Sequence, residues 1–284
     1  MVKEELLNRF YENLDERSRS SLDEAVEKIV AAKARGGKVV VATGSGPNIH
    51  AGVTTLIAEL MDKGMVDGVT TSSAVVGHEM AGALDRVKMC SAAVLGFDPA
   101  FMPRSGVFEF TRLSREQLDA LRKEMVLDED LLERGEKADG RLVIKAAGNM
   151  AYPMGLRTEN LAGELLVISK AYGLPFEVVA GWGADRRTMI GKGAEKGLSV
   201  LVSIPQMVGS GHVGMAVGDS ISLFERSMRV ASMLESADVI IESAVALTQE
   251  IHDGPFECYT GHGIWSWWKG LRTFSLRGKT LIRI

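Results

Sequence analysis

The sequence predicts a single α/β domain in which helices flank a mostly parallel sheet. Amphipathic helical segments alternate with short β-branched runs along the 284 residues. Several runs are continuously apolar, as expected of strands covered on both faces. Many of the 31 glycines, about 11% of the chain against a typical ~7%, directly follow such runs. We expect the domain to span residues 1–284, with an N-terminal helical segment over about 1–36.

The first 75 residues predict a helix, a strand, a second helix and a second strand. A Ser-x-x-Glu capping box at 21–24 lies within apolar residues at helical spacing, and Gly36-Gly37 ends that segment. The run Lys38-Val39-Val40-Val41-Ala42 is a buried strand, and a glycine loop follows it. The expected elements are a helix at 3–35, a strand at 38–42, a helix at 51–63 and a strand at 65–71.

The rest of the chain predicts further alternation. A second capped segment begins at Ser114, and β-branched runs recur before glycine-rich loops. A connection rich in proline and phenylalanine is expected over 98–112. The expected helices lie within 72–84 and at 114–139, 158–172 and 219–236. The expected strands lie at 141–144, 176–180, 200–204, 238–242 and 279–284.

The glycine loop at 44–52 is the first candidate binding site. It follows a strand and opens a helix, so backbone N–H groups and the helix dipole would face a ligand there. A tight turn without a ligand is the alternative, because Ile49 stands where the dinucleotide fingerprint has its third glycine. The residues expected to contact a cofactor are Gly44, Ser45, Gly46, Asn48 and His50.

Hydroxyl groups mark the end of the next strand. Thr71, Ser72 and Ser73 are expected to hold ribose or phosphate oxygens of the same cofactor. Helix capping by one of the serines is an equal alternative. His78 and Glu79 follow and could form an acid–base pair, although a histidine near a helix start is more often structural.

Two segments near the C-terminus combine ionisable groups with tryptophan. Glu250, His252 and Asp253 follow a predicted strand, and Lys269 comes two residues after Trp267 in a tryptophan-rich stretch. A lysine desolvated by aromatic rings has a lowered pKa and can attack a carbonyl or imine carbon. An apolar cluster whose lysine reaches water is the alternative.

Two further glycine-rich loops, at 181–187 and 207–214, follow predicted strands. Gly209 and Ser210 fit another phosphate or ribose cradle. Arg186 could pair with a substrate carboxylate or phosphate. A solvated surface loop is the alternative for both segments.

The stretch from Gly44 to Met80 resembles the first NAD-binding segment of deoxyhypusine synthase. The matching residues are Gly64-Met65-Val66-Asp67 with Thr70-Thr71-Ser72, and later Gln249-Glu250, Asp253-Gly254 and Ser266-Trp267-x-Lys269. The resemblance implies a Rossmann-like fold, NAD as cofactor (with NADP also compatible), an imine at Lys269 and a substrate pocket lined by Trp267. It also implies a homo-oligomer, a dimer or tetramer, with sites near subunit interfaces.

The chain also departs from that family. Gly77-His78 stand where the family has glutamates, and the acidic residues that would hold a polyamine before Lys269 are absent, so we do not expect it to make deoxyhypusine. Gly46-Pro47, His50 and His78-Glu79 are similar to the NAD-binding domain of archaeal-type ornithine cyclodeaminases. That similarity implies hydride abstraction from an amine-bearing carbon, loss of ammonia or transfer to a nucleophile, and hydride return.

Composition narrows the class of partner. The net charge of -4 and pI near 5.8 argue against nucleic acid or an anionic membrane. The two cysteines show no metal spacing, the N-terminus does not read as a signal sequence, and no apolar run approaches the ~20 residues of a membrane helix. We therefore expect a cytoplasmic protein with no bound metal.

The function predicted from these features is that of an NAD-dependent enzyme acting on a small amino acid or amine. Two alternatives remain open. A phosphosugar-binding isomerase would explain the first 60 residues but not the tryptophan-rich stretch. A non-catalytic dinucleotide-binding protein on the same fold would explain the altered family positions.

Overall fold

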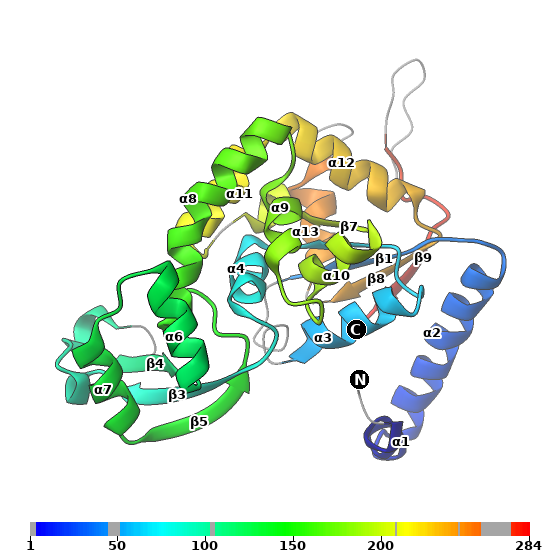
Figure 1. Ribbon diagram of the computed structural model, residues 1–284. Helices are drawn as coiled ribbons and strands as arrows, with labels where there is room; N and C mark the ends of the chain where they lie inside the picture. Colours follow the sequence, from blue (N-terminus) through cyan, green and yellow to red (C-terminus); the bar gives the residue numbers. More distant parts are fainter. Residues whose placement is uncertain (1–3, 45–51, 103–105, 208, 244, 257–273) are drawn as a thin grey trace.

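The computed structural model describes residues 4–44, 52–102, 106–207, 209–243, 245–256 and 274–284 (Figure 1). Within them the protein is a mixed α/β structure with two sheets, and five of the seven strand pairs are parallel. The prediction of an α/β fold with mostly parallel strands is therefore confirmed. Its division into one domain stays a prediction.

The main sheet has five parallel strands in the order β7-β2-β1-β8-β9. Numbered by their appearance along the chain, these strands run 3-2-1-4-5, which is the doubly wound order of dinucleotide-binding sheets. Their bounds are β1 Val39–Thr43, β2 Gly68–Thr71, β7 Ser199–Val202, β8 Val239–Ser243 and β9 Thr280–Arg283.

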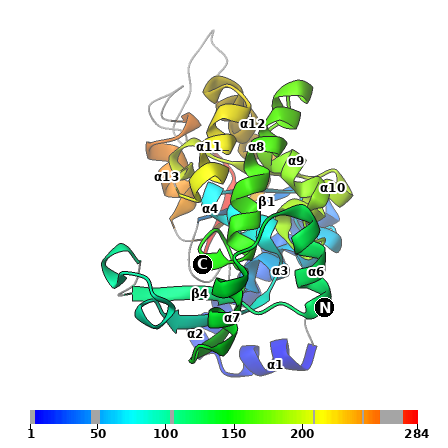
Figure 2. The ribbon, with the colours of Figure 1, turned by 60° about the vertical axis from the view of Figure 1, so that its left-hand side comes forward.

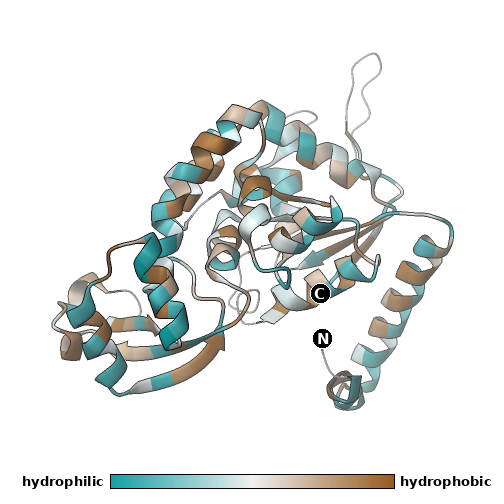
Figure 3. Cartoon of the chain, viewed as in Figure 1, coloured by the Kyte–Doolittle hydropathy of each residue, from teal (hydrophilic) through white to brown (hydrophobic). Residues whose placement is uncertain are grey.

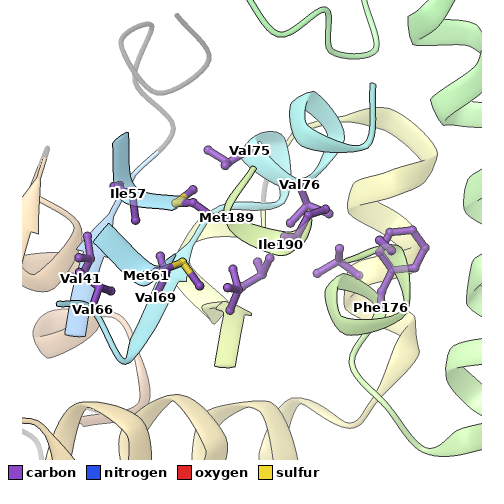
Figure 4. Packing of buried hydrophobic residues seen from close by; sticks show 14 of the residues in the cluster. Val41, Ile57, Met61, Val66, Val69, Val75, Val76, Phe176, Met189 and Ile190 are labelled. Carbon is purple, nitrogen blue, oxygen red and sulfur yellow. The ribbon is translucent and has the colours of Figure 1, made fainter. Parts of the chain in front are cut away.

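Each face of the main sheet is covered by its own helices. Val39 and Val41 pack with α3 (Thr54–Asp62) and α10 (Met189–Lys196) in one apolar cluster. Val40 and Ala42 pack with α12 (Leu223–Ser236) and α13 (Ala246–His252) in another. Figure 4 shows the first cluster, with Val41 and Val69 lying near Ile57 and Met61 of α3. This alternation explains why Val39 to Ala42 are apolar at every position.

The second sheet lies beside the main body, in the order β5-β3-β4-β6 (Figures 1 and 2). Its β3 strand (Asp85–Ser91) pairs antiparallel with β4 (Val107–Thr111) and β5 (Gly140–Lys145), and β4 pairs parallel with β6 (Ala151–Tyr152). Two helices, α6 (Arg115–Glu124) and α7 (Glu129–Lys137), contribute Leu121 and Leu132 to an apolar cluster around Phe110. The Glu109 and Lys145 side chains form a buried ion pair at 2.7 Å.

The remaining helices connect and frame the two sheets. The α4 helix (Ser73–Ala81) follows β2, and α8 (Met154–Tyr172) and α9 (Phe176–Gly183) lead toward α10. The α11 helix (Gly211–Ser220) follows β7 and precedes α12 in the chain. None of the described helices is by itself long and apolar enough to cross a membrane, although α8 and α9 together, bent by 118°, meet that length and composition test.

The N-terminal segment projects from the body as two helices, α1 (Glu4–Glu12) and α2 (Glu16–Ala34) (Figure 1). The expected single helix over 3–35 is thus interrupted, because Asp15 caps α2 by accepting a hydrogen bond from the Ser18 N–H at 2.9 Å. Only the last turns of α2 reach the core, through Ala32 and Ile29.

The helix expected over 114–139 is likewise divided, into α6 and α7. Three further element predictions were wrong. Residues 176–180 form the helix α9 instead of a strand, because contacts to the buried Glu177 outweigh the local β-branched preference. The connection expected over 98–112 contains strand β4, and the unpredicted β3 pairs with it. The glycine-rich loop expected over 207–214 gives way at Gly211 to the helix α11.

Candidate functional site

The carboxyl ends of the main-sheet strands converge where the strand order reverses, between β1 and β8. Ligands of doubly wound sheets bind at this position. The Gly44 N–H donates to the Ser243 carbonyl at 3.4 Å, so the two chain exits begin side by side. Gly44, the first residue of the predicted glycine loop, is therefore at the switch point, whereas Ser45, Gly46, Asn48 and His50 lie outside the described residues.

Two threonine hydroxyls at this edge are buried and make no hydrogen bond to the described residues. The β1–β2 register pairs Ala42 with Thr70, so Thr43 and Thr71 are the next neighbours along these strands. Both side chains are fully buried, and neither hydroxyl has a hydrogen-bond partner among the described residues. A buried hydroxyl without a partner costs about 1–3 kcal/mol. The edge therefore holds hydrogen-bonding capacity that the described chain does not satisfy.

The serines after β2 have structural partners. Ser72 is the N-cap of α4 and accepts a hydrogen bond from the Val75 N–H at 3.3 Å. Ser73 donates to the Gln206 carbonyl at 3.4 Å, and the Gln206 side chain donates to the Ser203 hydroxyl at 3.3 Å. These bonds join the exits of β2 and β7 into one polar edge.

Glu250 extends this edge from α13. Its side chain is fully buried, and burial raises the pKa of its carboxyl to about 7. Ser203 and Gln206 lie close enough to oppose that shift in pKa, but neither oxygen of Glu250 has a hydrogen-bond partner among the described residues. A buried carboxyl without a counter-ion is costly and is characteristic of binding and catalytic sites.

Glu79 is equally buried but has partners. Its carboxyl accepts hydrogen bonds from the Thr54 hydroxyl of α3 and from the Ile190 N–H of α10, the latter at 2.8 Å. Burial still raises the pKa of Glu79 to about 7. The neighbouring His78 points elsewhere, with Nδ1 3.0 Å from the Ala146 carbonyl. The partners of Glu79 therefore tie α4 to the layer formed by α3 and α10.

Two predicted ligand-binding segments are already engaged by the chain. At the start of α11, a carboxyl oxygen of Glu159 accepts a hydrogen bond from the His212 N–H at 2.6 Å, and Ser210 donates to the Ala74 carbonyl at 3.4 Å. The carboxylate thus takes the place that a phosphate would occupy at the N-terminus of α11, beside Gly211. The Arg186 guanidinium donates to the carbonyls of Gly181, Trp182 and Gly191 at 2.9–3.2 Å.

The C-terminal candidates are only partly described. His252 and Asp253 are exposed at the end of α13, one turn from the buried Glu250. Lys269 and Trp267 lie outside the described residues. The structure thus brings together Gly44, Thr71, Ser73 and Glu250 at one edge.

Sequence reasoning missed three contributors to this edge: Thr43, Ser203 and Gln206. Thr43 and Ser203 close the β-branched runs of β1 and β7, so their place at strand ends was the available signal. Gln206 lies in a short 3₁₀ helix, Ile204–Gln206, which no sequence pattern predicts.

The described residues contain no group of three or more histidine, cysteine or acidic side chains placed to hold a metal. A cavity of about 680 Å³ lies at the opposite, amino end of the strands beside α12. Two of its charged wall residues, Glu225 and Arg229, are paired with each other at 2.6 Å, and we assign no chemistry to it.

No family model matches the chain, and no curated protein shows significant similarity to it. Among solved structures it is similar to AgrE in a ternary complex with ornithine and NAD+, at 16% identity and a TM-score of 0.45, over 84% of this chain and 26% of AgrE. The chain thus spans about a quarter of the length of AgrE.

Two smaller structures are also similar. A LOR/SDH protein from Methanococcus maripaludis S2 shares 10% identity at a TM-score of 0.40, over 81% of this chain and 51% of that one. A structure assigned as a deoxyhypusine synthase from Entamoeba histolytica shares 9% identity at a TM-score of 0.45, over 87% and 85%. Identities this low concern the fold and say nothing of the reaction.

Proposed function

We propose that the protein is an NAD-dependent enzyme acting on an amine or amino acid at the carboxyl edge of the main sheet. One observation carries the proposal: in a sheet of doubly wound order, buried polar groups without a hydrogen-bond partner among the described residues gather at this edge. They include hydroxyls, which suit a ribose or phosphate, and the carboxyl of Glu250, which suits an ammonium group.

The described residues fit a dinucleotide. The Thr43 and Thr71 hydroxyls have free hydrogen-bonding capacity, and Gly44 opens the loop in which we place the remaining cofactor contacts, Ser45, Gly46, Asn48 and His50. When bound, the nicotinamide would supply hydride transfer with the carbon that bears the substrate amine. Because the sequence resemblance alone chooses NAD over NADP, both belong in the test.

Glu250 would bind the substrate as an amine. Its carboxyl has no counter-ion among the described residues, so an incoming ammonium group would be its first cationic partner. A pKa near 7 also lets Glu250 take up or release a proton at neutral pH. Imine formation at Lys269 and a pocket wall at Trp267 remain proposals from the sequence resemblance, as do roles for His252 and Asp253.

A homo-oligomer and a cytoplasmic location also remain proposals. The exposed apolar residues of α2 are a candidate surface for subunit contact; apolar and polar residues alternate along this helix (Figure 3). Leu22, Val26 and Val30 recur every four residues, are 42%, 49% and 52% exposed, and adjoin Ile29, which packs against the core.

The cofactor proposal can be tested by calorimetric titration with NAD, NADP and glucose 6-phosphate. We expect one of the dinucleotides to bind, and Thr71→Val to weaken that binding about tenfold, the loss of one good hydrogen bond. Thr70→Val is the matched control, because Thr70 also has a buried, unpartnered hydroxyl but lies inside β2 on its other face. Binding of the sugar phosphate alone would overturn the proposal in favour of a phosphosugar protein.

Turnover is tested separately with ornithine and other amino acids in the presence of the bound dinucleotide. We expect ammonia release or reduced cofactor in the wild type and a large loss in Glu250→Gln. Dinucleotide binding without turnover of any amine would favour the non-catalytic alternative.

A further inference from the structure

A separate cavity of about 300 Å³ lies where the second sheet joins the main body. Its walls come from the 81–85 connection between α4 and β3, from α6 and α8, and from the loop that joins α9 to α10. It shares no lining residue with the carboxyl-edge site. The volume is at the lower end of small-molecule sites, which span roughly 300–1,000 Å³.

Asp85 gives this cavity an acidic wall without a counter-ion of its own. One of its carboxyl oxygens, Oδ2, is buried and has no hydrogen-bond partner among the described residues. Burial and the nearby negative charge of Asp185 raise the pKa of Asp85 to about 6, against the opposing effect of Arg187. Arg187 forms its ion pair with Asp185, at 2.6 Å. An external cation would therefore find a carboxyl oxygen, Oδ2, that the described residues leave without a hydrogen bond.

Arg157 gives the cavity a basic wall. Its Nε pairs with the Glu124 carboxylate at 2.5 Å, and no contact within the described residues uses its two terminal nitrogens. The guanidinium is held in place by that pair and can still donate two parallel hydrogen bonds to a carboxylate. Between the two charged walls, Leu121 and Met154 add apolar surface.

We propose that this junction cavity binds a free α-amino acid with a small aliphatic side chain. Asp85 receives the ammonium group, Arg157 receives the carboxylate, and the side chain packs against Leu121 and Met154. Opposite charges on two walls favour a zwitterion over a simple amine or a simple acid, because only the zwitterion uses both the free acceptor of Asp85 and the terminal nitrogens of Arg157. A bound amino acid would also bridge the second sheet and the main body, since the walls belong to both.

The test is calorimetric titration of the intact protein with L-leucine and with its two truncated analogues. 3-Methylbutylamine lacks the carboxylate, and 4-methylpentanoate lacks the ammonium group. We expect L-leucine to bind and both analogues to bind at least tenfold more weakly. Absence of L-leucine binding, or equal binding of either analogue, would overturn the proposal.

Variants assign the binding to this cavity. Asp85→Asn and Arg157→Gln should each weaken L-leucine binding at least tenfold, and the conservative Arg157→Lys should retain part of it. Asp62→Asn, an exposed acidic residue of α3 outside the cavity, serves as the matched control and should bind normally. Unfolding midpoints of all variants show whether they fold.

Glu250→Gln separates this site from the proposed active site. We expect that variant to bind L-leucine as the wild type does, whatever the outcome of the cofactor experiments. If Glu250→Gln abolishes L-leucine binding while Asp85→Asn does not, the amino acid binds at the carboxyl edge and the junction site is refuted.

Discussion

Replacing Glu250 by glutamine should stabilise the protein above neutral pH while impairing amine binding. Burial raises the pKa of this carboxyl from 4.5 to about 7. At about 1.4 kcal/mol per pH unit, the ionised carboxylate costs the folded state up to about 3 kcal/mol. Glutamine removes that charge but keeps two polar atoms that also lack partners, so we expect a net gain of about 1–3 kcal/mol at pH 8.

The sign of the effect follows from proton binding. Below pH 4.5 both the folded and the unfolded protein hold this proton, so Glu250 makes no difference to stability. Between pH 4.5 and about 7 the folded protein keeps a proton that the unfolded chain has released, so the free energy of unfolding falls as the pH rises. Above pH 7 the full cost is present. The gain from Glu250→Gln should therefore be small at pH 4.5 and largest at pH 8.

Urea denaturation of both proteins at pH 4.5, 6, 7 and 8 measures this difference. Glu79→Gln is a matched control, because burial raises the pKa of Glu79 to about 7 as well, but its carboxyl accepts bonds from Thr54 and Ile190. An amide nitrogen facing either donor loses a hydrogen bond, so Glu79→Gln should gain less than Glu250→Gln or lose stability. Equal gains in the two variants, or a Glu250→Gln variant that is less stable at pH 8, would refute the assignment of Glu250 as an unpaired group.

Two further predictions concern the scaffold. Arg226→Met leaves the fully buried carboxyl of Glu177 without its cation and should cost about 3–5 kcal/mol in urea denaturation; a loss below 1 kcal/mol would mean that the pair is not structural. Gly163→Ala, in the middle of α8 with no atom within 4 Å of the added carbon, should stabilise by about 0.5–1 kcal/mol. Gly191→Ala should destabilise the protein by more than about 2 kcal/mol, because the added Cβ would clash with the Asp185 carbonyl oxygen. A Gly191→Ala variant that is more stable than Gly163→Ala in thermal denaturation would contradict this packing.

The strands of the main sheet could be predicted because both of their faces are buried. β1 begins with four apolar residues and β8 with three, and this pattern depends only on local composition. The strand order that creates the switch point could not be predicted, because it depends on pairing between residues 200 positions apart, such as Val39 and Val239.

The segment 176–180 shows where local preference fails. Its β-branched residues favour a strand, but the Glu177 carboxyl accepts a hydrogen bond from the Val202 N–H at 2.7 Å and pairs with Arg226 at 2.5 Å. These contacts are made inside the folded core, between the helix α9, strand β7 and helix α12. Tertiary bonds of this kind leave no periodic signal in the sequence.

Glycines expected in loops after strands are in part inside helices, Gly181 in α9 and Gly214 in α11, and several have a packing role in place of ligand contact. A carbon added at Gly181 would lie 2.4 Å from the Ile190 carbonyl, and one at Gly77 would lie 2.4 Å from the Ser210 hydroxyl. Close approach of neighbouring segments therefore requires glycine at these two positions. The glycine content of a sequence does not distinguish glycines required by close packing from glycines that contact a phosphate.

The distribution of unpaired buried groups is the strongest reason to place function at two positions. Most buried charged side chains of the described residues have at least one partner, but Thr43, Thr70, Thr71 and Glu250 have none for their buried oxygens, and Asp85 has none for Oδ2. Folding selects against such groups, since each costs about 1–3 kcal/mol or more when charged. Single atoms of other described residues also lack a partner, but these side chains make other hydrogen bonds: Arg19, Glu159, Glu177, Arg226 and Glu242. Thr43, Thr71 and Glu250 lie at or beside the carboxyl ends of adjacent strands, Thr70 lies inside β2 on its other face, and Asp85 lines the junction cavity. A ligand that satisfies these groups would recover that free energy on binding, so the same atoms that weaken the free protein would contribute affinity in the complex.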